Sequence, residues 1–131
     1  MSINVEWDGD EKTAVRFTYL GQWTLPEFYT AIDQSNAMMA EVGRKVNVII
    51  DTRKSNALPN NFISVMRMMP SKASPNTGTI VIVGANAFIR AFANTIARLF
   101  PSEQQRKVIL ADTLDSARSE LAKQLGRAVQ G

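Results

Sequence analysis

Short apolar runs rich in β-branched residues alternate with longer amphipathic stretches along this chain, and this alternation limits the fold more than any other feature. Residues 48–50 (Val-Ile-Ile) and 80–83 (Ile-Val-Ile-Val) are typical of strands that are covered on both faces. Between such runs, apolar residues recur every three or four positions, which indicates helices. Strands that alternate with helices predict an α/β fold built on a mainly parallel sheet.

We predict a mixed, mainly parallel five-stranded sheet with four helices, in the order β-β-α-β-α-β-α-β-α. The first two strands alternate apolar and polar residues and form an antiparallel hairpin, whose turn contains Gly9. Thr24 and Glu27 form a capping box that begins the first helix, and Gly43 ends it. The expected strands are 3–7, 14–19, 46–51, 79–83 and 108–111; a loop covers 52–58; the expected helices are 25–42, 59–69, about 86–100 and 114 onward.

Composition fits one domain that spans residues 1–131, since 45% of the residues are hydrophobic and no linker or repeat interrupts the pattern. The chain contains no cysteine and no histidine. It therefore has no disulfide, no thiolate metal site and no Ser-His-Asp or Cys-His catalytic set. We expect a protein that is not an enzyme and needs no cofactor. With no apolar segment long enough to cross a bilayer and no signal-like start, we expect a cytoplasmic protein without membrane insertion.

The element order, residues 48–51 (Val-Ile-Ile-Asp) and residues 75–78 (Pro-Asn-Thr-Gly) before the next apolar strand resemble the STAS domain of sulfate-transporter tails and anti-sigma-factor antagonists. The resemblance implies a regulatory module that binds another protein through the loop and helix after the third strand. In the antagonists a serine at the start of that helix is phosphorylated. The matching stretch here, 57–62, has no hydroxyl residue, and the nearest hydroxyls are those of Thr52 and Ser55.

Residues with anion-binding or partner-binding chemistry are expected at the carboxyl edge of the sheet. Arg53, Lys54 and Ser55 follow the third strand, while Gly84 and Asn86 precede a helix whose N-terminus favours anions. Asp51 and Asp112 end the third and fifth strands. Two interpretations remain open for them: a Mg²⁺ or acid–base site, or the binding of loop N–H groups and the capping of a helix. We favour the second.

A basic segment supplies further candidates, because residues 52–102 contain six bases and no acid. Arg90 and Arg98 recur on the outer face of the expected third helix, and Met68 lies off the core stripe of the second. These features favour a protein partner with an acidic surface. Nucleic acid is not expected, because aromatic residues are not interleaved with the bases.

Three alternatives for binding follow from other features of the sequence. One is a carrier of a small ligand, lipid or nucleotide, in which clustered methionines line an apolar cavity. Another is a homodimer, since the opening hairpin leaves a sheet edge that can pair with a second copy. Trp23 and Tyr29 flank the first helix and either line a pocket or dimer contact or close the apolar start of that helix. For this aromatic pair we favour the closure.

Overall fold

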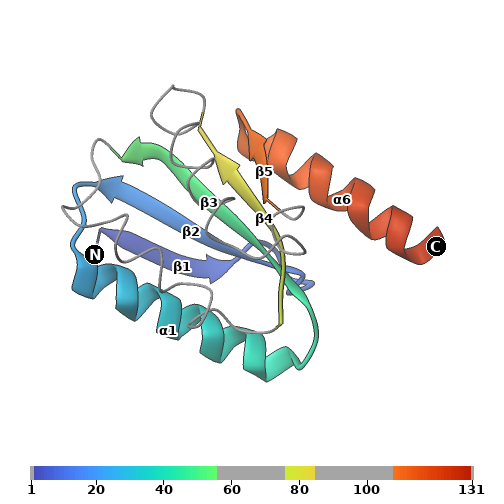
Figure 1. Ribbon diagram of the computed structural model, residues 1–131, viewed down its shortest axis with the longest axis horizontal. Helices are drawn as coiled ribbons and strands as arrows, with labels where there is room; N and C mark the ends of the chain where they lie inside the picture. Colours follow the sequence, from blue (N-terminus) through green and yellow to red (C-terminus); the bar gives the residue numbers. More distant parts are fainter. Residues whose placement is uncertain (1, 56–75, 85–107, 131) are drawn as a thin grey trace.

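The computed structural model describes residues 2–55, 76–84 and 108–130, which form a mixed five-stranded sheet with a helix on each face (Figure 1). The strands lie in the order β1-β2-β3-β4-β5, so each strand pairs with the next one described along the chain. The elements are β1 (Ile3–Trp7), β2 (Ala14–Gly21), α1 (Leu25–Val42), β3 (Val46–Ser55), β4 (Thr77–Val83), β5 (Val108–Ala111) and α6 (Leu114–Gln130).

The expected five-stranded sheet is confirmed, including its antiparallel start. β1 pairs antiparallel with β2, and the three other pairings are parallel. The described ranges contain two helices and not four, since the expected helices 59–69 and 86–100 lie outside them. Neither described helix is long and apolar enough to span a membrane.

One expected boundary was wrong in a way that affects the site. β3 does not end at Asp51 but continues to Ser55, so Arg53 and Lys54 belong to the strand and not to a loop. The strand continues because β2 also extends, and Leu20 pairs with Lys54 beyond a register shift. Ladder pairing with a neighbouring strand is a long-range effect that polar local sequence does not reveal.

The hairpin and α1 follow their local signals closely. Gly9 takes a positive φ of 112° in the turn, and Gly43 ends α1 at a φ of 63°, in the left-handed region that glycine tolerates. At the other end of α1 the Thr24 side chain accepts from the Glu27 backbone N–H, and the Glu27 carboxylate accepts from the Thr24 backbone N–H. This capping box satisfies N–H groups that have no partner within the helix.

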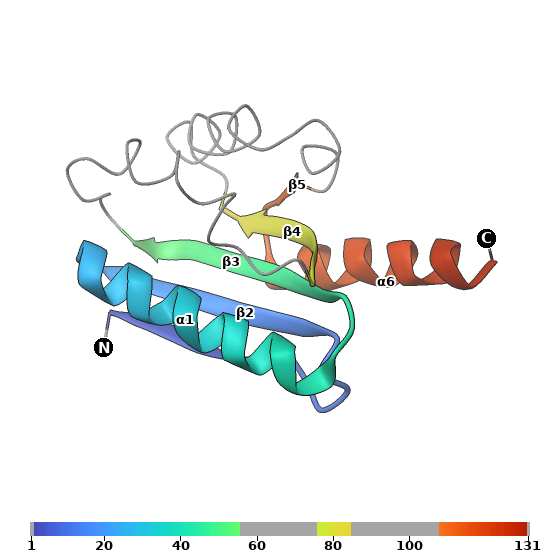
Figure 2. The same ribbon diagram turned by 60° about the horizontal axis from the view of Figure 1, so that its bottom comes forward.

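The two faces of the sheet bury separate apolar clusters, because neighbouring residues on a strand point to opposite faces. α1 lies along β1 and β2 on one face, as Figure 2 shows, and it covers the larger cluster. α6 packs against β3, β4 and β5 on the other face, through Ala117 and Leu121. The first cluster contains Ile3, Val15, Phe17, Tyr19, Trp23, Phe28, Ala31, Met39, Val46, Val48 and Ile82; the second contains Ala14, Ile49, Val81, Val83, Ala111, Ala117 and Leu121.

The start of β4 explains why a glycine stands at position 78. The Asn47 side chain accepts a hydrogen bond of 2.9 Å from the Thr79 backbone N–H, where the register of β3 and β4 shifts. A Cβ atom on Gly78 would lie 2.5 Å from Asn47 Oδ1. Only glycine therefore allows the Asn47 side chain to approach the β4 backbone so closely.

Candidate functional site

The carboxyl ends of the four parallel strands meet at one edge of the sheet, where the sequence predicted a binding site. Register pairs place Lys54 beside Leu20 and Val83 beside Ala111, so Arg53, Lys54 and Gly84 lie along this edge. This edge is the place where open α/β sheets bind ligands. Four predicted site residues, Met68, Asn86, Arg90 and Arg98, lie outside the described residues.

Arg53 is not an unpaired cation at this edge, because Asp51 holds it. Its Nε donates to Asp51 Oδ1 and its Nη2 to Oδ2, both at 2.9 Å, and its backbone N–H donates to Oδ1 at 3.1 Å. The Asp51 side chain is only 6% exposed. Burial alone would raise the pKa of Asp51, but the hydrogen bonds from Arg53 outweigh burial and lower that pKa. The pair is locally neutral, which removes one of the two cations expected for an anion site.

The interpretation that we favoured for the two aspartates holds for Asp51 and is wrong for Asp112, which does not cap α6. Asp51 accepts from a backbone N–H, as expected. At the start of α6 it is Thr113 and not Asp112 that caps the helix, because its hydroxyl accepts from the Ser116 backbone N–H at 3.0 Å. Within the described ranges, no three acidic side chains gather in a geometry that could hold a metal ion.

The hydroxyls of Thr52 and Ser55 both act as hydrogen-bonding partners within the fold. Thr52 is buried and donates to the Val83 carbonyl at 2.8 Å. Ser55 Oγ accepts from the Trp23 indole N–H and donates to the Gly21 carbonyl, each at 3.2 Å. A phosphoryl group on either residue would have to displace these bonds, so the hydroxyls serve to join β2, β3 and β4.

Lys54, like Arg53, is exposed at the carboxyl ends of the strands, but it differs from Arg53 in its pairing. Among the described residues no carboxylate forms an ion pair with it. The backbone N–H of Gly84 is not available to an anion, since it donates to the Ala111 carbonyl at 2.9 Å. Of the described groups predicted to bind an anion, Lys54 alone keeps its charge uncompensated.

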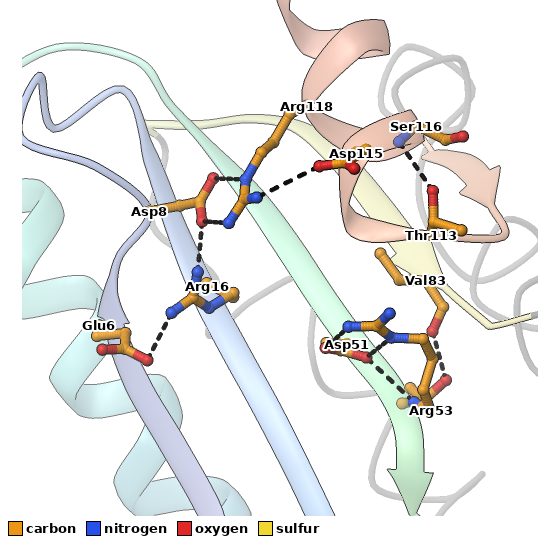
Figure 3. Close-up of polar contacts among 11 residues, drawn as sticks. Glu6, Asp8, Arg16, Asp51, Arg53, Val83, Thr113, Asp115, Ser116 and Arg118 are labelled. Atoms are coloured by element: carbon orange, nitrogen blue, oxygen red, sulfur yellow. Dashed lines mark hydrogen bonds and ion pairs between the residues drawn. The ribbon is translucent and has the colours of Figure 1, made fainter.

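A charged cluster that sequence reasoning missed joins the hairpin to α6 on the α6 face of the sheet (Figure 3). We call it the hairpin–helix cluster; its members are Glu6, Asp8, Arg16, Asp115 and Arg118. Asp8 accepts from Arg118 Nε at 3.0 Å and from Arg118 Nη2 at 2.9 Å, and Arg16 binds the same carboxylate. The Asp8 side chain is 7% exposed. The hydrogen bond from Arg118 is the main cause that lowers the pKa of Asp8.

A cleft of about 450 Å³ opens beside this cluster, between the hairpin turn and α6. Its volume is in the range of small-molecule sites. However, two carboxylates and two guanidiniums lie in its lining, which does not suit a lipid chain, and no methionine contributes. The lining residues are Trp7, Asp8, Gly9, Glu11, Thr13, Ala14, Arg16, Arg118, Leu121 and Ala122. Small-ligand binding therefore stays a prediction, and Met66, Met68 and Met69, on which the idea of a methionine-lined cavity was based, lie outside the described residues.

Trp23 and its aromatic neighbours close the apolar start of α1. The Trp23 ring lies 5.0 Å from the Tyr19 ring and 5.6 Å from the Phe28 ring, and all three side chains are buried. Tyr29 is half-buried and meets Phe28 edge-on at 6.1 Å. The favoured interpretation of the aromatic pair, hydrophobic closure, agrees with this packing. Through its hydrogen bond to Ser55, Trp23 also supports the end of β3 that carries Lys54.

Comparison with known proteins identifies the class of fold. No protein-family model matches the chain, and a search of curated proteins gives no match. Among solved structures, the chain is similar to an uncharacterized protein of the DUF3478 family with a SpoIIAA-like fold, from Shewanella loihica, with a TM-score of 0.64. The match covers 88% of this chain and 90% of the other, at 12% sequence identity.

The fold is therefore SpoIIAA-like, which is the STAS-like class that the sequence predicted. The structural match establishes a shared fold, and at 12% sequence identity it shows nothing about a shared activity. What this chain does has to be argued from its own residues.

Proposed function

We propose that the protein is a non-enzymatic, cytoplasmic regulatory module that binds an acidic surface of another protein through the carboxyl end of β3 and the segment that follows. The observation that carries the proposal is the exposed Lys54 at the end of β3, followed in the sequence by bases and no acid as far as residue 102. The STAS-like fold supports this role, since the resemblance implies partner binding through the same loop and helix.

Side chains at the carboxyl ends of the strands are also held by hydrogen bonds, which suits recognition of a partner. Ser55 is fixed by Trp23 and Gly21, and Arg53 is fixed by a bidentate carboxylate. A preorganised surface loses little conformational entropy when a partner binds. The chain has no histidine or cysteine to act as a general base, and the Asp51 carboxylate is already held by Arg53.

Photo-cross-linking in the source cells tests this proposal with a defined position. A photoreactive amino acid replaces Gln22, which is exposed and follows the β2 residue paired with Ser55. A control probe replaces Ala40, which is exposed near the other end of α1. We expect one partner adduct at position 22 and none at position 40. Lys54→Glu is expected to reduce the adduct at least about fivefold, because electrostatic repulsion at an interface lowers both affinity and association rate.

Lys123→Glu is the matched control, because it makes the same charge change at an exposed position on α6. It should leave the adduct at position 22 unchanged. Arg53→Glu is a poor substitute for Lys54→Glu, because a second carboxylate beside the buried Asp51 would destabilise the fold itself. Equal adducts in the Lys54→Glu and Lys123→Glu proteins would contradict the proposed docking surface.

A further inference from the structure

Among the described strands β1 forms an outer edge of the sheet, and none of them lies beside its outward backbone groups (Figure 1). Leu20 donates to the Ser2 carbonyl at 2.7 Å and Asp8 donates to the Ala14 carbonyl at 2.8 Å. In an antiparallel pair the bonded positions alternate, so residues 2, 4, 6 and 8 exchange hydrogen bonds with β2. Ile3, Val5 and Trp7 therefore direct their N–H and C=O groups away from β2.

β1 lacks three of the features that prevent edge strands from pairing: proline, lysine and a bulge. Within residues 3–7 there is no proline, no lysine and no shift in register against β2. The exposed side chains are those of Asn4 and Glu6, on the face opposite α1. Glu6 supplies the one charge of the strand, and it already has a partner in Arg16.

We propose that β1 pairs antiparallel with β1 of a second copy, about a two-fold axis at Val5, to form one continuous sheet. In this register Ile3 lies opposite Trp7 of the second copy. The three residues of each strand whose backbone N–H and C=O groups point away from β2 then face the same three residues of the other strand. Each such pair exchanges two backbone hydrogen bonds, about six in all. An axis normal to the sheet keeps both α1 helices on the same face.

The exposed side chains distinguish this register from its neighbours. With the axis at Val5, Asn4 lies opposite Glu6 of the second copy, twice by symmetry, and the amide can donate to the carboxylate. A shift of the axis toward the carboxyl end of β1 would place Glu6 opposite Glu6, where like charges repel. A shift the other way would place Asn4 opposite Asn4 and leave Trp7 beyond the paired segment. The register centred on Val5 therefore combines the longest ladder with the favourable pair.

Two substitutions at one exposed position test the contact without altering the core. Asn4→Lys places a cation opposite Glu6 of the second copy, and Asn4→Glu places an anion there. By sedimentation equilibrium we expect the wild-type chain to form a dimer of twice 14.5 kDa. The dissociation constant should fall by about tenfold in Asn4→Lys and rise by about tenfold in Asn4→Glu, because the altered pair occurs twice. A mass of 14.5 kDa at every concentration up to about 1 mM would overturn the proposal.

Cysteine trapping tests the register, because the native chain has no cysteine that could interfere. Asn4→Cys and Glu6→Cys proteins are oxidised separately and as a mixture. Positions directly opposite in an antiparallel ladder bring Cα atoms within disulfide range. We expect disulfide dimers in the mixture and little in either protein alone. Cross-linking of Asn4→Cys alone or Glu6→Cys alone, or none above an Ala40→Cys collision control, would contradict this pairing.

Discussion

The two faces of the sheet are held to their helices by different physics. Under α1 the contact is large and aromatic, with Trp23, Tyr19 and Phe28 packed together and no ion pair among them. Under α6 the buried residues are alanines, valines, one isoleucine and one leucine, and a bidentate ion pair from Arg118 to Asp8 ties the helix to the hairpin. The comparison indicates that apolar area holds α1 in place, while α6 depends in part on charge.

This difference bears on the candidate docking surface, because the carboxyl end of β3 borders both faces of the sheet. Lys54 lies at the end of β3, whose last residue bonds to the aromatic α1 side through Trp23. The hairpin–helix cluster lies over β1 and β2 on the other face. Substitutions in the hairpin–helix cluster should therefore lower the stability of α6 more than they affect partner binding at the carboxyl end of β3.

The largest expected effect is the loss of an aromatic ring under α1. Phe28→Ala should lower the free energy of unfolding by roughly 3–5 kcal/mol, because it removes a side chain that is 3% exposed and leaves a cavity. Leu121→Ala under α6 should cost less, roughly 2–3 kcal/mol, because its neighbours are smaller. Urea unfolding monitored by circular dichroism measures both values. A larger loss for Leu121→Ala would contradict the ranking of the two faces.

A smaller and pH-dependent effect is expected from Asp8→Asn. The amide cannot compensate the two guanidiniums of Arg16 and Arg118, and we expect a loss of about 1–3 kcal/mol at pH 7. Urea titrations from pH 2 to 7 give the difference in the free energy of unfolding between wild type and variant at each pH. Phe28→Ala serves as the control, since its loss should not vary with pH.

The way this loss of stability varies with pH follows from the direction in which the pKa of Asp8 is shifted. The folded pKa of Asp8 lies below the usual aspartate value of 3.8, so the carboxylate stabilises the fold above about pH 4. That contribution is lost as the pH falls through the folded pKa. The difference between wild type and Asp8→Asn should therefore shrink in acid. A difference that stays constant down to pH 2 would show that the ion pair does not stabilise the fold.

The smallest expected effects are those of the helix caps. Thr24→Ala removes one half of a reciprocal capping box, whereas Thr113→Ala removes a single bond to the Ser116 N–H. Each should cost about 0.5–2 kcal/mol, with Thr24→Ala the larger of the two. Thr24→Ser and Thr113→Ser keep the hydroxyl and should restore most of the stability. If the serine variants unfold as easily as the alanine variants, capping is not the cause.

Local patterns in the sequence correctly predicted the elements whose signals lie within a few residues. The capping box at Thr24, the turn at Gly9 and the helix end at Gly43 are all present. In α6, Ala117 and Leu121 are buried and Leu114 is partly buried, which is the spacing of three and four residues that an amphipathic helix requires. In the candidate site, the prediction that Arg53, Lys54 and Gly84 share one edge is confirmed by the register of β2 to β5.

Predictions failed where a contact depends on residues far apart in the chain. Asp8 and Arg118 are separated by 110 positions, so no spacing rule relates them. Arg53 was expected to be available to an anion, but β3 continues past Asp51 and holds the two side chains on the same face, two residues apart. The extension of β3 itself required β2 as a neighbour.

The sequence by itself determined the order of the described strands and helices, the capping box of α1, and the absence of histidine and cysteine side chains, because these depend on residue type and short-range periodicity. The tertiary structure decided which charges remain available. Burial and pairing neutralise Arg53 and Asp8 and leave Lys54 exposed. The physical reason is that the strength of a charge depends on its surroundings, and those surroundings are assembled from strands and helices distant in the chain.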